Sequence, residues 1–120
     1  MDTIEEQLTN SRTIAVVGLS PDPDRPSHYV AEYLQRHGYR IIPVNPLIDE
    51  VLGEKSFPDL RSVPVSIDMV DIFRRSEHVP PLVDEAIEIG VRHIWMQDGV
   101  TNVEASALAR AAGLSVVMDN

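Results

Sequence analysis

Short β-prone runs alternate with amphipathic helical patterns along almost the whole of this sequence. The first run, Thr13–Val17, is apolar on both alternating faces, as a buried parallel strand is. The helical patterns repeat apolar residues every three or four positions and stop at glycines such as Gly38 and Gly90. This regular alternation predicts a doubly wound α/β fold with a parallel sheet.

The positions of the expected elements follow from where each pattern begins and ends. We expect about five strands, at residues 13–17, 39–44, 68–73, 91–96 and 114–118. We expect helices at residues 2–12, 27–37, about 80–89 and 102–112. Together they predict one three-layer α/β/α domain over residues 1–120, with the strand order 3-2-1-4-5.

Charge and composition exclude several classes of function. A net charge of −9 and a pI near 4.7 argue against a nucleic-acid partner, because affinity for a phosphate backbone needs clustered Lys and Arg. With no cysteine, the chain has no thiol nucleophile, Cys-ligated zinc or iron–sulfur cluster. No apolar run approaches the ~20 residues of a membrane span, and the acidic N-terminus is unlike a signal peptide. We therefore expect a soluble cytoplasmic protein with no membrane partner.

Four loops that follow the expected strands meet at one edge of such a sheet. Ligands of open α/β sheets bind outside the carboxyl ends of the strands, where the strand order reverses. For the order 3-2-1-4-5 this crevice lies between the first and fourth strands. The loops that border it are residues 18–27, 45–46, 73–78 and 97–100.

Two of these loops carry groups suited to a nucleotide. The loop from Gly18 leads into a helix at Ser27, and a helix N-terminus after a strand offers free N–H groups to a phosphate. Phe73 leaves its strand beside Arg74, so an aromatic ring is available to stack on a base while a guanidinium holds phosphate. Taken singly, each feature is equally explained as an ordinary turn or a solvated charge pair. Taken together, they favour a binding site.

Motifs for other nucleotides are missing from the sequence. An NAD site needs a G-x-G-x-x-G loop and an acid after the second strand, whereas here Gly18 has no second loop glycine and Asn45 replaces the acid. A Gly-Lys-Ser/Thr sequence, the mark of a P-loop, is also absent.

Catalytic and metal-binding patterns are equally weak. The histidines, at positions 28, 37, 78 and 93, lack the spacing of metal ligands, and only His78 lies in a candidate site loop. We find no nucleophile beside a base, so we expect no metal and no catalysis by the chain's own residues.

Five segments resemble a known family. They are residues 13–20 (TIAVVGLS), 23–27 (PDRPS), 38–46 (GYRIIPVNP), 68–75 (DMVDIFRR) and 95–97 (WMQ). These segments closely resemble the small stand-alone CoA-binding proteins, which are similar to the N-terminal CoA-binding domain of the succinyl-CoA synthetase α-subunit and have a Rossmann-like fold. The resemblance covers nearly the whole chain and implies that coenzyme A or an acyl-CoA binds at the carboxyl edge.

The resemblance also implies which residues hold the cofactor. Those implied for phosphate or ribose, partly through backbone N–H groups, are Gly18, Leu19, Ser20, Arg25 and Ser27. Those implied for the adenosine part are Asn45, Pro46, Phe73 and Arg74, and Gln97 and Gly99 border the pantetheine arm.

Three functions remain open at this point. The first is a CoA-binding module without activity of its own. The second is an accessory subunit of an acyl-CoA synthetase or transferase, with catalytic residues supplied by a partner, because the synthetase's phosphohistidine belongs to a second domain that this sequence does not match. The third is a regulatory or interaction domain with a vestigial pocket. A homodimer is also expected, because a partner commonly covers the edge strands of a small open sheet.

Overall fold

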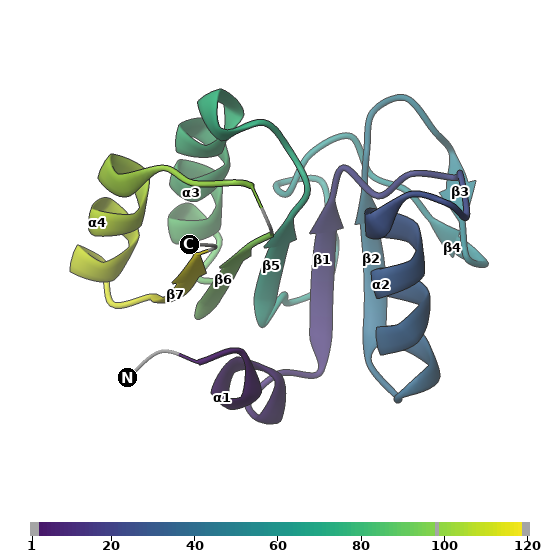
Figure 1. Cartoon of the computed structure of the whole chain (residues 1–120), viewed down its shortest axis with the longest axis horizontal. Helices are drawn as coiled ribbons and strands as arrows, with labels where there is room; N and C mark the ends of the chain where they lie inside the picture. Colours follow the sequence, from purple (N-terminus) through teal and green to yellow (C-terminus); the bar gives the residue numbers. More distant parts are fainter. Residues whose placement is uncertain (1–2, 98, 119–120) are drawn as a thin grey trace.

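The chain forms a five-stranded parallel sheet with helices on both faces (Figure 1). The structure is a computed structural model that describes residues 3–97 and 99–118. The sheet strands are β1 (Thr13–Val17), β2 (Arg40–Val44), β5 (Met69–Ile72), β6 (His93–Met96) and β7 (Ser115–Met118). The helices are α1 (Ile4–Thr9), α2 (Pro26–Arg36), α3 (Val79–Glu88) and α4 (Val103–Ala111), with a 3-10 turn η1 (Ser76–His78) before α3. A small antiparallel hairpin pairs β3 (Glu50–Val51) with β4 (Glu54–Lys55). The predicted α/β fold with five parallel strands is confirmed.

Two hydrophobic clusters, one on each face of the sheet, hold the helices in place. Ile14 and Val16 point from β1 toward α1 and α2, and Ala15 and Val17 point toward α3 and α4. All four side chains are buried, so β1 is covered on both faces, as its unbroken apolar sequence predicts.

The strand order is β2-β1-β5-β6-β7, so the predicted order is wrong. In chain order the strands run 2-1-3-4-5, because the third strand pairs with the first and not with the second. Pro43 explains why β2 lies at the edge of the parallel sheet: a proline has no N–H to donate, and sheets confine it to edge strands. The outer side of β2 instead holds an irregular segment, in which Phe57 N donates to the Pro43 carbonyl at 3.0 Å.

This order moves the crevice. The strand order reverses between β1 and β5, and not between the first and fourth strands as predicted from the sequence. The Phe73 N–H donates to the Val17 carbonyl at 2.9 Å, so the segments that leave β1 and β5 begin side by side. The loops at Gly18 and Phe73 therefore border the ligand crevice that is typical of this topology.

The helix ends largely agree with their sequence signals. The Thr3 side chain accepts from Glu6 N and caps α1, and the Asn102 side chain accepts from Ala105 N and caps α4. Helix α1 is shorter than predicted, because Asn10 ends it, and residue 2 of the predicted helix lies outside the described residues. None of the helices in the described part of the chain is long and apolar enough to cross a membrane.

Candidate functional site

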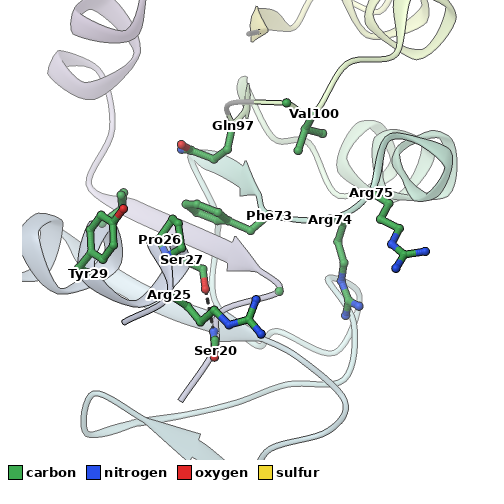
Figure 2. Close-up of a pocket in the computed structure, with 13 residues that line it drawn as sticks. Ser20, Arg25, Pro26, Ser27, Tyr29, Phe73, Arg74, Arg75, Gln97 and Val100 are labelled. Carbon is green, nitrogen blue, oxygen red and sulfur yellow. Dashed lines mark hydrogen bonds between the residues drawn. The ribbon is translucent and has the colours of Figure 1, made fainter. Parts of the chain in front are cut away.

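A cavity of about 670 Å³ opens at the carboxyl edge of the sheet, where β1 and β5 end (Figure 2). Most of the residues implied for the cofactor line it: Gly18, Ser20, Arg25, Ser27, Phe73, Arg74, Gln97 and Gly99. Five further residues line it that were not assigned from the sequence: Pro26, Tyr29, Val30, Arg75 and Val100. Three of the five fall within the loops predicted to border the crevice, and Tyr29 and Val30 follow in the first turns of α2.

The remaining predicted residues lie outside this cavity. Leu19 is fully buried, and its side chain belongs to the core under α2. Asn45 links two strand ends, because its Nδ2 donates to the Leu19 carbonyl at 3.0 Å and its Oδ1 accepts from Leu47 N at 2.9 Å. Pro46 lines a second cavity beside the first. The predicted proximity of the loops after β1 and β2 is thus confirmed, with Asn45 as the link between them.

Hydrogen bonds hold the loop after β1 against the start of α2. Ser20 N donates to Ser27 Oγ at 2.9 Å, and His28 Nδ1 lies 2.9 Å from the Ser20 carbonyl. Gly18 N donates to the Val44 carbonyl at 2.9 Å. Two of the backbone N–H groups implied for a phosphate therefore already have acceptors within the protein.

Guanidinium groups supply the positive charge of the cavity. Its lining contains Arg25, Arg74 and Arg75 and, among the described residues, no acid. Arg25 lies 3.9 Å from Asp22 in an exposed ion pair, which contributes little energy. Within the described part of the chain, the side chains of Arg74 and Arg75 form no ion pair or hydrogen bond. A chain with a net charge of −9 thus gathers three cations in one cavity, which suits an anionic ligand.

The Phe73 ring separates the two ends of the cavity. In the view of Figure 2, the guanidinium groups of Arg25 and Arg74 lie below the ring and the Gln97 side chain lies above it. One end therefore suits phosphate, and the other offers a neutral amide beside an aromatic surface.

A second cavity of about 280 Å³ adjoins the first and shares Arg74 with it. Val17, Val44 and Pro46 line one part of it. The other part is lined by Pro58 and Asp59, by His78 at the end of η1, and by Pro81, Leu82 and Glu85 of α3. Arg74 is therefore positioned to contact a ligand that extends over the edge of the sheet from one cavity into the other.

A buried acid lies beneath the Gln97 end of the first cavity. Asp71, on β5, is fully buried, and its Oδ1 accepts a hydrogen bond from Gln97 Nε2. Burial raises the pKa of Asp71 to about 8, although the bond from Gln97 lowers it in part. The sequence pattern does not predict a role for this acid, because nothing local to β5 indicates its partner 26 residues later.

Among its described residues, the lining of the first cavity contains no Cys, His, Asp or Glu. No group of three or more His, Cys, Asp or Glu that could hold a metal occurs among the residues that the structure describes. His28 is buried against the loop after β1, and His37 is exposed at the end of α2, where its Nδ1 lies 2.8 Å from the Tyr33 carbonyl. The arrangement can bind and orient a ligand through charge, stacking and hydrogen bonds.

Comparisons with known proteins agree with this geometry. A family model described as "CoA binding domain" matches residues 12–120. The uncharacterized protein YneT of Bacillus subtilis is 47% identical over 116 residues, which cover 97% of this chain and 86% of that protein. The solved structure of a hypothetical protein from Pyrococcus horikoshii has a TM-score of 0.93 and 41% identity, covering 98% of this chain and 82% of that one.

A larger relative contains a similar region. The α subunit of the ADP-forming acetate–CoA ligase II of Pyrococcus furiosus is 31% identical over 86 residues. The match covers 71% of this chain and only 19% of that subunit.

Proposed function

Because this chain belongs to the CoA binding domain family, we propose that it binds coenzyme A or an acyl-CoA at the carboxyl edge of its sheet, without catalytic activity of its own. The observation that carries the proposal is the cavity, which gathers three arginines beside Phe73 in an otherwise acidic chain that matches the family from residue 12 onward. The phosphates of CoA are the anionic part, and guanidinium groups hold phosphate through paired N–H donors.

The two cavities suggest how such a ligand lies. The nucleotide end occupies the region around Arg74, between the first cavity and the smaller one lined by Val44 and Pro46. The pantetheine arm extends past Phe73 toward Gln97 and Gly99. In this arrangement the charged groups of CoA meet the arginines, and the amides of the arm meet the uncharged end.

Parallel thermal unfolding with CoA, acetyl-CoA, ATP and NAD tests the proposal. A ligand at 100 times its dissociation constant stabilises the folded state by about 2.7 kcal/mol, which gives a readable increase in Tm. We expect an increase with CoA and acetyl-CoA and none with NAD. No increase with any of the four contradicts the proposal and favours an interaction domain with a vestigial pocket.

A second candidate function rests on the likeness to part of a ligase subunit. The matched region makes up 19% of that α subunit, and a piece of that size in a larger enzyme would depend on other parts for chemistry. As an accessory subunit of an acyl-CoA synthetase or transferase, the protein would be inert with acyl-CoA alone and active once a partner is added. Isolation of the tagged protein from its own cells, followed by an acyl-CoA synthetase assay of the complex and of the purified chain, separates the two functions.

A further inference from the structure

Asp71 breaks the pattern of the most buried strand of the sheet. Its neighbours on β5, Met69, Val70 and Ile72, are apolar and fully buried, and Asp71 itself has no exposed surface. It lies in register with Val16 on one side and Trp95 on the other. A carboxyl buried in this way lowers stability unless it is hydrogen-bonded, and among the described residues only one of the two Asp71 oxygens has a partner.

The bond to Gln97 connects this acid to the cavity. Asp71 does not line the cavity, and its Oδ2 has no hydrogen-bond partner among the described residues. Gln97 does line the cavity, and its Nε2 donates to Asp71 Oδ1. The backbone of Gln97 is fixed as well, because its N–H donates to the Ile72 carbonyl at 3.2 Å and its carbonyl accepts from Val100 N at 2.8 Å.

We propose that Asp71 is a positioning residue that sets the orientation of the Gln97 amide, so that Gln97 Oε1 faces the ligand as an acceptor. A glutamine amide has a donor end and an acceptor end. One of the two Nε2 hydrogens is bonded to Asp71, and this bond turns the acceptor oxygen Oε1 toward the cavity, where no described residue donates to it. The site therefore selects a ligand that carries an N–H donor at this point.

This inference rests on the proposed function and names the part of CoA that Gln97 recognises. The pantetheine arm of CoA contains two amide N–H donors, whereas 3′-phosphoadenosine 5′-diphosphate, its nucleotide half, lacks the arm. Asp71 therefore contributes to the affinity for the arm and leaves the affinity for the nucleotide half unchanged.

The role of Asp71 as acceptor does not depend on ionisation. Burial raises the pKa of Asp71 to about 8, so the carboxyl is largely neutral at pH 7. A neutral carboxyl keeps a carbonyl oxygen, here Oδ1, that accepts from Gln97 Nε2, while the proton resides on Oδ2, which has no hydrogen-bond partner among the described residues. Asparagine is the isostere of this neutral acid, which makes Asp71→Asn the conservative variant.

Isothermal titration of the full chain with CoA and with 3′-phosphoadenosine 5′-diphosphate tests the proposal. We expect Asp71→Val and Gln97→Leu each to weaken CoA binding about 3- to 10-fold, the range of one neutral hydrogen bond, with the nucleotide half unaffected. Asp71→Asn should keep the affinity for CoA within about twofold. The double variant should bind CoA no worse than Gln97→Leu alone, because Asp71 acts through Gln97. Ser106→Ala, which changes another fully buried polar residue, on α4, is the matched control.

Each outcome supports or overturns the proposal. Equal losses of affinity for CoA and for 3′-phosphoadenosine 5′-diphosphate indicate a purely structural role for Asp71 and overturn the proposal. Losses of CoA affinity that add in the double variant overturn it as well. If Asp71→Val does not fold by circular dichroism, Asp71→Ala takes its place, and unchanged CoA affinity in Gln97→Leu overturns the proposal independently. If the wild-type chain binds neither ligand, the proposed function fails together with this inference. If it binds CoA and the variants are not selective, only this inference fails.

Discussion

A Cβ atom placed on Gly18 would lie 2.3 Å from the carbonyl oxygen of Phe73. This is far inside van der Waals contact, so only glycine allows the loop after β1 to pass this close to the end of β5. The same position has a φ of +86°, a conformation that side chains disfavour, and Arg74 Nε would lie 3.5 Å from the added atom. Gly18 therefore allows both the turn after β1 and the close approach of this loop to the end of β5, where it lines the cavity.

Gly18→Ala should lower the free energy of unfolding by about 2 to 4 kcal/mol, because the added methyl group meets backbone that cannot yield easily. The matched control is Gly38→Ala, where φ is +92° but nothing lies within 4 Å of the added atom. That variant should lose only about 1 to 2 kcal/mol from the left-handed conformation itself. Urea unfolding of both variants measures the difference, and equal losses would contradict a close approach at Gly18.

Arg74→Ala should weaken CoA binding about 10- to 150-fold, the range expected for loss of a charged hydrogen bond to phosphate. Arg74 borders both cavities and has no side-chain partner among the described residues, so its charge is available to a ligand. Isothermal titration at two salt concentrations checks this, since the loss should shrink as salt screens the interaction. Arg36→Ala is the control, because Arg36 is 73% exposed in an ion pair with Glu32 at the other end of α2. An affinity that Arg74→Ala leaves unchanged removes Arg74 from the site.

The sequence predicts the fold class well and the strand order poorly. Alternation of strand and helix patterns is a local property, and the strands and helices formed close to their predicted positions. Strand order depends on pairing between distant segments, and several orders satisfy the same local patterns. Pro43 was the available signal, because it disfavours any order in which the second strand has a neighbour on both sides.

The candidate site, too, could be predicted from the sequence only in part. The loops that line the cavity, and the family, could be recognised from the sequence, because strand ends in this fold converge on one edge. The engaged N–H of Ser20 and the bond between Asp71 and Gln97 depend on side-chain contacts that no local pattern encodes. Binding by the individual residues, the homodimer and a cytoplasmic location stay predictions.

Asp68→Ala should lower the free energy of unfolding by about 1 to 3 kcal/mol at neutral pH. Asp68 Oδ2 accepts from Arg12 N at 2.9 Å and from Thr13 N at 3.0 Å, which joins the start of β1 to the start of β5. Burial raises the pKa of Asp68, but the bonds from Thr13 and Arg12 outweigh this and leave it below the usual value of 3.8. The stabilisation is therefore present above pH 3.8 and lost as the pH falls through the lower, folded-state pKa. Denaturant unfolding at pH 7 and pH 3 checks this, with the exposed Asp84→Ala as control, and a loss that is the same at both pH values contradicts the role of the carboxylate.

Asp71 should have the opposite effect on the pH dependence of stability. Its pKa rises from 3.8 in the unfolded chain to about 8 in the folded protein, because burial disfavours the charged form. Between these two values the folded state holds a proton that the unfolded state has lost, so stability falls as the pH rises, by at most about 1.4 kcal/mol per pH unit. Asp71→Asn removes this titration and keeps the shape of the neutral acid. The unfolding free energy of Asp71→Asn relative to wild type should therefore increase from about pH 4 to about pH 8 and then level off. Urea unfolding of both proteins across that range measures the difference, and a constant difference would mean that Asp71 ionises normally in the folded state.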